Sequence, residues 1–322
     1  MPKKSPLPPP SEATPSDDGE KPSRARLALL LLALVAVLAL AARKIGPTLL
    51  YTLRHKEPVL VPHEGEPVLL VVKRTHVPGS TRETHETLVV DGTPRTYVLL
   101  VPIAPKPGPL PLVLVFHGDG GSDRSFHEGF PFEMQTRDDA IVVYPDGRFA
   151  TWELHKGAEE NPDIHFVEAI ANELANKLPI DRSRIFGTGY SSGGFLINLM
   201  ACERPGFFRA IASNAGGAPY QRAEKFSNGF TKCKGQLPIP MMALHGTQDF
   251  GVGIDSGAFS AQYWAYVNGC DTEQMETTAY DECHAYRKCP KDKAVLFCRV
   301  EGLGHWVWDR AAEATWTFFL KT

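Results

Sequence analysis

The sequence predicts an α/β fold in which a mostly parallel central sheet carries helices on both faces. Leu112–Phe116 and Ala140–Pro145 are continuous apolar runs, which are typical of strands buried on both faces of a parallel sheet. From there to the C-terminus, segments with helical periodicity alternate with strand-like segments, as in parallel strands joined by helices. The chain has 322 residues, enough for one large domain or two small ones.

Antiparallel strands are expected at the N-terminal edge of this sheet. Glu86–Val90 and Arg95–Pro102 both have the composition of strands, and Asp91-Gly92 between them is a hairpin turn signal. Pro67–Val72 is a further predicted strand ahead of this hairpin.

The clearest helix signal lies between the predicted strands of the central sheet. Asn161 is a favourable N-cap, and Pro162 suits the first helical position. Apolar side chains recur at three- and four-residue steps from Ile164 to Leu178 and form one stripe. The other predicted strands are residues 183–189, 208–217, 239–246 and 294–302, and the other predicted helices are residues 194–203, 258–267 and 309–320.

The first 44 residues differ in composition from the rest of the chain. Residues 1–23 hold many prolines and few apolar groups, which favours disorder. Leu27–Ala42 is an uninterrupted apolar run with basic residues on both sides. It fits an export signal, with Ala39–Ala42 as the cleavage site, or an uncleaved membrane anchor, which the long leading segment favours. The expected organisation is a disordered tail at residues 1–23, an anchor or signal at residues 24–44, a linker at residues 45–65 and a folded domain at residues 66–322.

Six cysteines bear on the compartment in which the protein works. An even number of cysteines behind an export-type segment favours disulfides in an oxidising compartment, but six allow 15 pairings and the spacing selects none. A zinc site is an alternative, although no C-x-x-C pair is present, and Cys202 and Cys298 would also fit as small buried apolar residues. The candidate zinc ligands are Cys283, His284, Cys289 and Cys298.

A glycine- and serine-rich turn predicts a nucleophilic serine. Residues 189–193 read Gly-Tyr-Ser-Ser-Gly and match G-x-S-x-G, in which a strand enters a helix through a tight turn that exposes the central serine. The register selects Ser191, because centring the pattern on Ser192 would put Tyr190 where glycine is required. A phosphate-binding loop is excluded because no lysine follows, and a dinucleotide pattern because Ser192 stands in place of the third glycine.

A serine nucleophile needs a base, and the base needs an acid that orients it. Asp249 and His305 each follow a predicted strand directly, at the carboxyl edge where sites in open α/β sheets form. Asp255 is an alternative acid deeper in the same loop. The sequence therefore predicts a triad of Ser191, Asp249 and His305.

A second glycine-rich segment, His117–Gly121, follows the buried strand Leu112–Phe116 and leaves backbone N–H groups free to bind a developing oxyanion. The expected donors are the backbone N–H groups of Ser192 and Asp119, and His117 is expected to brace the segment. Tyr190 and Trp306 are candidate substrate-binding residues, since large aromatic side chains flank the predicted nucleophile and base.

Several segments together resemble the group of α/β-hydrolases that contains polyhydroxybutyrate depolymerases and feruloyl or acetylxylan esterases. The matching pieces run in collinear order over about residues 84 to 320 and read VDGTPRTYVLLVP, LVLVFHGDGGS, YPDG, TWEL, IDRSRIFGTGYSSGG, MACERPGFFRAIASNAGG, ALHGTQD, VNGC and VEGLGHWVW. The resemblance implies the α/β-hydrolase fold, catalytic roles for Ser191, Asp249 and His305, and a disulfide between Cys270 and Cys289. The chain departs from the group in lacking a proline soon after the histidine and in reducing a pair of acids to Asp163.

We therefore expect an extracytoplasmic serine esterase, secreted or anchored through residues 27–42, that forms an acyl-enzyme and needs no metal or organic cofactor. Its expected partners are the membrane and an ester, which is a polyester, an acylated polysaccharide or a small ester. The net charge of −3 argues against nucleic acid. Two alternatives are a serine peptidase of the same fold and an inactive, membrane-anchored binding protein on a hydrolase scaffold.

Overall fold

The structure, a computed structural model, describes residues 56–65, 68–69, 80–219 and 224–322. The predicted disordered tail and the apolar segment 27–42 lie outside the described residues, so their assignments stay predictions. Among the described residues, no helix combines the length and apolar character that a membrane span requires.

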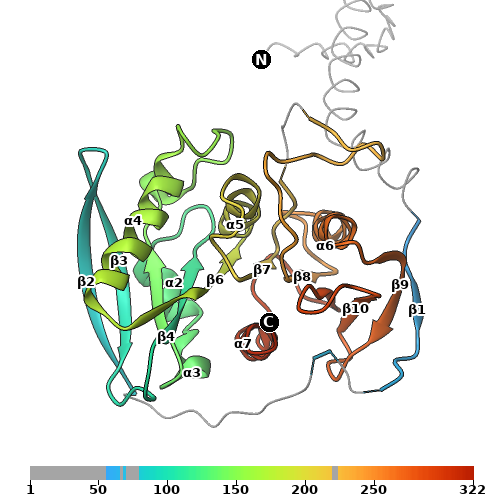
Figure 1. Cartoon of the computed structure of the whole chain (residues 1–322), viewed down its shortest axis with the longest axis horizontal. Helices are drawn as coiled ribbons and strands as arrows, with labels where there is room; N and C mark the ends of the chain where they lie inside the picture. The colour runs from blue at the N-terminus through green and yellow to red at the C-terminus, as the bar shows by residue number, and fades with distance from the viewer. Residues whose placement is uncertain (1–55, 66–67, 70–79, 220–223) are drawn as a thin grey trace, which may run out of the picture. The chain divides into compact units, whose positions relative to one another are not determined.

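Eleven strands of the described residues form one sheet in the order β1-β9-β10-β11-β8-β7-β6-β4-β5-β3-β2 (Figure 1). From β11 to β5, neighbouring strands run parallel. Antiparallel β2 and β3 extend the sheet beyond β5, which confirms the predicted fold class and its antiparallel N-terminal edge. The strands are β1 (Val59–Val61), β2 (Thr81–Val90), β3 (Thr93–Pro102), β4 (Leu110–Phe116), β5 (Ile141–Pro145), β6 (Ile180–Tyr190), β7 (Ala210–Asn214), β8 (Met241–Gly246), β9 (Asp271–Thr277), β10 (Cys283–Arg287) and β11 (Val295–Val300).

Helices cover both faces of the sheet. α4, α5 and α6 pack on one face, and α3 and α7 pack on the other (Figure 1). The helices are α2 (Asp123–Gly129), α3 (Glu133–Thr136), α4 (Pro162–Lys177), α5 (Ser192–Glu203), α6 (Ile254–Asn268) and α7 (Ala311–Phe319), with a 3₁₀ turn, η1, at Arg148–Ala150.

Burial explains why the central strands are apolar without alternation. Every residue of β4 and of β5 is buried, because helices lie against both of their faces. On the α7 side, Phe186 stacks on Phe319 with ring centroids 4.6 Å apart. α4 begins as predicted, since the Asn161 side chain accepts hydrogen bonds from the backbone N–H groups of Asp163 and Ile164.

The second edge of the sheet was missed by the sequence analysis. β9 and β10 pair antiparallel and connect the edge strand β1 to β11. β9 is mostly polar and β10 has only five residues, so neither shows a continuous apolar run. β1 lies within residues 45–65, so the sheet begins inside the predicted linker. The strand predicted at Pro67–Val72 is wrong where it is described, because Val68 and Leu69 lie in a bend.

All six cysteines are paired in disulfides, which excludes the zinc site and the free buried thiols. Cys270 pairs with Cys289, the pair that the family resemblance implied. Cys283 pairs with Cys298 across the β10–β11 ladder, where the two residues are direct partners. These two bonds hold β9 and β10 together and attach β10 to β11.

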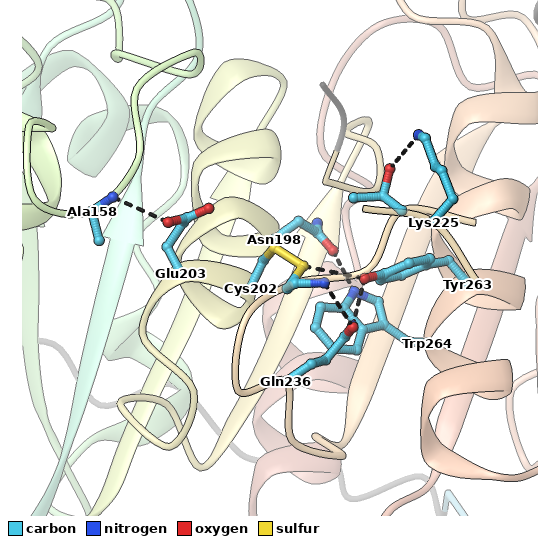
Figure 2. The surroundings of a disulfide bond; sticks show 10 residues. Ala158, Asn198, Cys202, Glu203, Lys225, Gln236, Tyr263 and Trp264 are labelled. Atoms are coloured by element: carbon cyan, nitrogen blue, oxygen red, sulfur yellow. Dashed lines mark hydrogen bonds between the residues drawn. A yellow bond between two sulfur atoms is a disulfide. The ribbon is translucent and has the colours of Figure 1, made fainter. Parts of the chain in front are cut away.

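The third disulfide joins the end of α5 to the segment that precedes β8. Cys202 is bonded to Cys233, 31 residues later (Figure 2). Beside it, the Gln236 side-chain amide donates to the Tyr263 hydroxyl on α6 at 2.5 Å. In the chain-entropy description, closing a loop of this length stabilises the fold by about 3 to 4 kcal/mol. The disulfide and the bond to Tyr263 therefore connect α5, the segment before β8 and α6.

Candidate active site

Ser191 lies in a strained turn between β6 and α5. Its backbone has φ 52° and ψ −118°, outside the regions that a serine normally occupies. A Cβ on Gly189 would collide with the backbone of Gly193, and a Cβ on Gly193 would collide with the carbonyls of Phe116 and His117, which explains the glycines at both positions. Such strain persists only where surrounding contacts impose it, and it holds the Ser191 hydroxyl at the carboxyl edge of the sheet.

Two loops bring the predicted base and acid to this serine. Ser191 Oγ lies 2.9 Å from His305 Nε2, and His305 Nδ1 lies 2.8 Å from Asp249 Oδ2. Both distances suit hydrogen bonds, so Nδ1–H donates to the carboxylate and Nε2 is left to accept the serine proton. The three predicted side chains therefore form one connected hydrogen-bonded chain.

The Asp249 carboxylate is fixed by its own loop. Oδ1 accepts the backbone N–H groups of Gly251 at 2.9 Å and Val252 at 2.8 Å. Oδ2 faces His305. Asp255, the alternative acid, is instead exposed in the first turn of α6.

His245, near the end of β8, contributes a further contact to Asp249. Its Nε2 lies 2.8 Å from the Val252 carbonyl and 3.2 Å from Asp249 Oδ2, so Nε2 carries the proton. Burial lowers the pKa of His245, which keeps the ring neutral. The neutral Nε2–H of His245 helps to hold the Asp249 carboxylate without adding a second positive charge beside it.

The second glycine-rich segment, His117–Gly121, which we call the oxyanion loop, packs against the serine turn. A Cβ on Gly118 would lie 3.0 Å from the Ser191 Cβ. Among the described residues, the backbone N–H groups of Asp119 and Ser192 have no hydrogen-bond acceptor. These are the two donors predicted from the sequence, and both belong to segments that meet at Ser191. Their role as oxyanion donors stays a prediction.

His117 braces the oxyanion loop as a neutral ring. Nδ1–H donates to the Gly118 carbonyl at 2.8 Å, and Nε2 accepts the Gly147 backbone N–H at 2.9 Å. Burial lowers the pKa of His117 from its ordinary value of 6.5, although the carboxylates of Asp146, Asp123 and Asp119 act in the opposite direction. A protonated Nε2 would lose its bond to Gly147.

Replacing His117 with glutamine is expected to make stability less dependent on pH. The unfolded chain protonates His117 as the pH falls through about 6.5, whereas the folded protein resists protonation. This residue therefore stabilises the fold above pH 6.5, and that contribution is lost as the pH falls toward the folded pKa. Glutamine keeps an acceptor near Nε2 but does not titrate. Urea unfolding at pH 7, 6 and 5 measures how steeply the free energy of unfolding depends on pH.

His165, whose pKa is shifted in the opposite direction, is the control for this experiment. The hydrogen bond to Asp91 raises the pKa of His165, so its contribution is present at low pH and is lost as the pH rises. His165→Gln should therefore steepen the loss of stability on acidification. Equal slopes for wild type and His117→Gln would show that His117 is not held neutral.

Tyr190 supports the His305 loop. Its hydroxyl donates to the His305 carbonyl at 2.7 Å, and its ring lies between Phe126 and Trp306, with centroids at 6.0 and 5.0 Å. Burial, followed by the carboxylate of Asp249, raises the pKa of Tyr190 to about 12, so the hydroxyl remains a donor. Its predicted contact with substrate stays a prediction.

Trp306 separates the Tyr190 side of the site from a neighbouring cavity of about 900 Å³. The side chain is 47% exposed, and its ring packs beside Gly129 at the end of α2. Ser191 does not line this cavity. Trp306 is thus placed to meet a substrate that extends beyond the serine, and its substrate-binding role also stays a prediction.

Sequence comparisons find similarity to hydrolases. The model of the prolyl oligopeptidase family matches residues 129–236, which include Ser191 but not Asp249 or His305. Feruloyl esterase B of Piromyces equi is 26% identical over 215 residues, which are 61% of this chain and 39% of that protein. A probable feruloyl esterase C of Aspergillus flavus is 32% identical over 186 residues, which are 55% of this chain and 63% of that protein. Each match thus spans less than two thirds of the relative's length.

Solved structures share the fold. An acetyl xylan esterase from Aspergillus awamori superposes with a TM-score of 0.59 at 20% identity, covering 73% of this chain and 99% of that one. A ferulic acid esterase from Anaeromyces mucronatus superposes with a TM-score of 0.53 at 16% identity, covering 82% of this chain and 98% of that one. At these identities the likeness shows the α/β-hydrolase fold.

Proposed function

Because the chain has the α/β-hydrolase fold and is similar in sequence to feruloyl esterases, we propose that it is a serine hydrolase of carboxylic esters. The observation that carries the proposal is the hydrogen-bonded chain from Ser191 Oγ through His305 to Asp249, at 2.9 and 2.8 Å. This arrangement activates a hydroxyl that is otherwise a weak nucleophile.

The proposed reaction proceeds through an acyl-enzyme. His305 Nε2 takes the proton of Ser191 as Oγ attacks the ester carbonyl, and Asp249 stabilises the resulting imidazolium. The backbone N–H groups of Ser192 and Asp119 receive the tetrahedral oxyanion. His305 then protonates the leaving alcohol, and a water activated by the same ring releases the acid and restores Ser191.

The proposed location is outside the cytoplasm. Three disulfides within one chain support an oxidising compartment, where such bonds persist. The apolar segment 27–42 would deliver the chain to the membrane or across it.

A substrate panel tests the proposed activity. The purified full-length protein should hydrolyse p-nitrophenyl acetate, and a fluorophosphonate probe should label Ser191. The ratios of kcat/KM for methyl ferulate, acetylated xylan, polyhydroxybutyrate particles and short acyl esters then identify the preferred ester. If the protein neither hydrolyses any of these esters nor reacts with the probe, it is not an esterase.

A serine peptidase is the second candidate, favoured by the matched prolyl oligopeptidase family model. The same triad would cleave an amide through the same steps. Paired p-nitrophenyl ester and p-nitroanilide substrates with one acyl group separate the two functions, because a peptidase would turn over the anilide and an esterase would turn over only the ester.

A further inference from the structure

A segment without its own role in the reaction holds the oxyanion loop in place. Residues 146–153, which we call the brace loop, lie between β5 and α4. Four hydrogen bonds join the brace loop to the oxyanion loop. They run from the Gly147 backbone N–H to His117 Nε2 (2.9 Å), from Trp152 Nε1 to the His117 carbonyl (2.8 Å), from the Gly120 backbone N–H to the Ala150 carbonyl (2.8 Å) and from the Thr151 hydroxyl to Asp119 Oδ1 (2.6 Å).

The backbone of the brace loop is strained. Phe149 and Ala150 are consecutive non-glycine residues with φ of 56° and 58°, in the left-handed region. Each such residue is unfavourable unless surrounding contacts impose it. The Phe149 side chain is exposed, so its packing does not hold this conformation. The hydrogen bonds at Ala150 and Thr151 hold the middle of the loop against the oxyanion loop, and a second restraint acts at its ends.

A buried ion pair provides that restraint at both ends. Arg95 on β3 and Asp163 on α4 are 2.7 Å apart, with side chains 4% and 3% exposed. Arg95 Nη2 also donates to the Asp146 carbonyl at 2.9 Å, at the first residue of the brace loop. Asp163 Oδ2 accepts the Glu153 backbone N–H at 2.7 Å, at the last residue.

We propose that Arg95 and Asp163 are positioning residues for the oxyanion hole, acting through the brace loop. The proposal rests on the proposed esterase function and adds two residues that never reach the substrate. Arg95 Nη2 bonds both Asp163 Oδ1 and the Asp146 carbonyl, and Asp163 uses its other oxygen for Glu153, so the pair clamps both ends of the loop against β3 and α4. Loss of the clamp lets the strained loop relax, and Asp119 N–H then moves away from the oxyanion.

The main test replaces the pair with apolar side chains. Arg95→Met/Asp163→Leu leaves no unpaired buried charge, and such replacements of buried pairs are often neutral for stability or stabilising. Neither new side chain can bind Asp146 or Glu153. We expect a thermal midpoint near that of the wild type, an unchanged KM for p-nitrophenyl acetate and a kcat about 10- to 100-fold lower, as misplaced catalytic groups produce.

Affinity for a tetrahedral analogue separates positioning from a general structural effect. Phenylboronic acid forms a tetrahedral adduct with Ser191 whose oxygen needs the same donors, so its Ki should rise by the same factor as kcat falls. Arg95→Lys is a second variant that preserves the charge and the fold. The lysine side chain ends one bond short of the Nη2 that binds both Asp163 and Asp146, so it would hold the two groups less well and kcat should fall by an intermediate factor.

The partly exposed pair Arg184 and Asp181, 2.6 Å apart on β6, is the matched control. Its double replacement by Met and Leu should leave kcat and the Ki for phenylboronic acid unchanged. Wild-type kcat and Ki in either Arg95 variant would overturn the positioning role, as would a fall in kcat without a rise in Ki. Wild-type protein that neither hydrolyses the ester nor binds the boronate would instead overturn the proposed function, and the inference with it.

Discussion

Replacing Ser191 with alanine is expected to lower kcat for ester hydrolysis by about 10⁶-fold, as loss of the nucleophile does in serine hydrolases of known mechanism. The residue is buried in the turn between β6 and α5, and its hydroxyl is hydrogen-bonded to His305. Removing one oxygen there should leave the fold intact, because Ser191 makes its turn contacts through the backbone, with N–H to the Asn214 carbonyl. Hydrolysis of p-nitrophenyl acetate and fluorophosphonate labelling measure the effect.

Ser192 is the neighbouring control for this prediction. Its Oγ is buried without a hydrogen-bond partner among the described residues, and only its backbone N–H is proposed to contact the oxyanion. Ser192→Ala keeps that N–H, so kcat should stay within about tenfold of the wild type, far above the loss at Ser191. A larger loss in Ser192→Ala than in Ser191→Ala would show that the register of the turn has been assigned to the wrong serine.

Replacing Asp249 with asparagine is expected to lower kcat by about 10⁴-fold, as the equivalent change does in a well-studied triad. The amide that replaces Oδ2 would donate to Nδ1 of His305, which favours the tautomer with a proton on Nε2. That tautomer cannot accept the Ser191 proton. The side chain keeps its size, and Oδ1 can still accept from Gly251 and Val252.

Asp255→Asn is the matched control for the acid, since Asp255 lies in the same connection but is exposed. Its kcat should stay within about twofold of the wild type, as for most surface substitutions. Circular dichroism of both variants would show that the fold is retained. A loss at Asp255 comparable with that at Asp249 would mean that His305 turns to the other acid during the reaction.

Much of the fold follows from local patterns that burial imposes on the chain. β4 and β5 read as continuous apolar runs because helices cover both of their faces. α4 is visible because a cap and an apolar stripe leave a periodic signal. β9 and β10 leave none, because they are short strands without a continuous apolar run, and their disulfide pairings carry no local mark in the sequence.

The candidate site also contains residues that local sequence patterns reveal and residues that they do not. G-x-S-x-G and the strand ends before Asp249 and His305 are local features, so sequence reasoning names all three side chains. The supports of these side chains differ in how far apart they lie along the chain. His245 lies only four residues from Asp249, whereas the brace loop is clamped by Arg95 and Asp163, 68 residues apart.

The sequence by itself determined the α/β architecture and the antiparallel N-terminal edge, and it predicted Ser191, Asp249 and His305 as the catalytic side chains, because glycine spacing and continuous apolar runs are properties of short segments. Only the tertiary structure decided how the four cysteines other than Cys270 and Cys289 pair, and that a buried ion pair binds both ends of the brace loop. These depend on side chains brought together by packing, whose distances in space are unrelated to their distances along the chain.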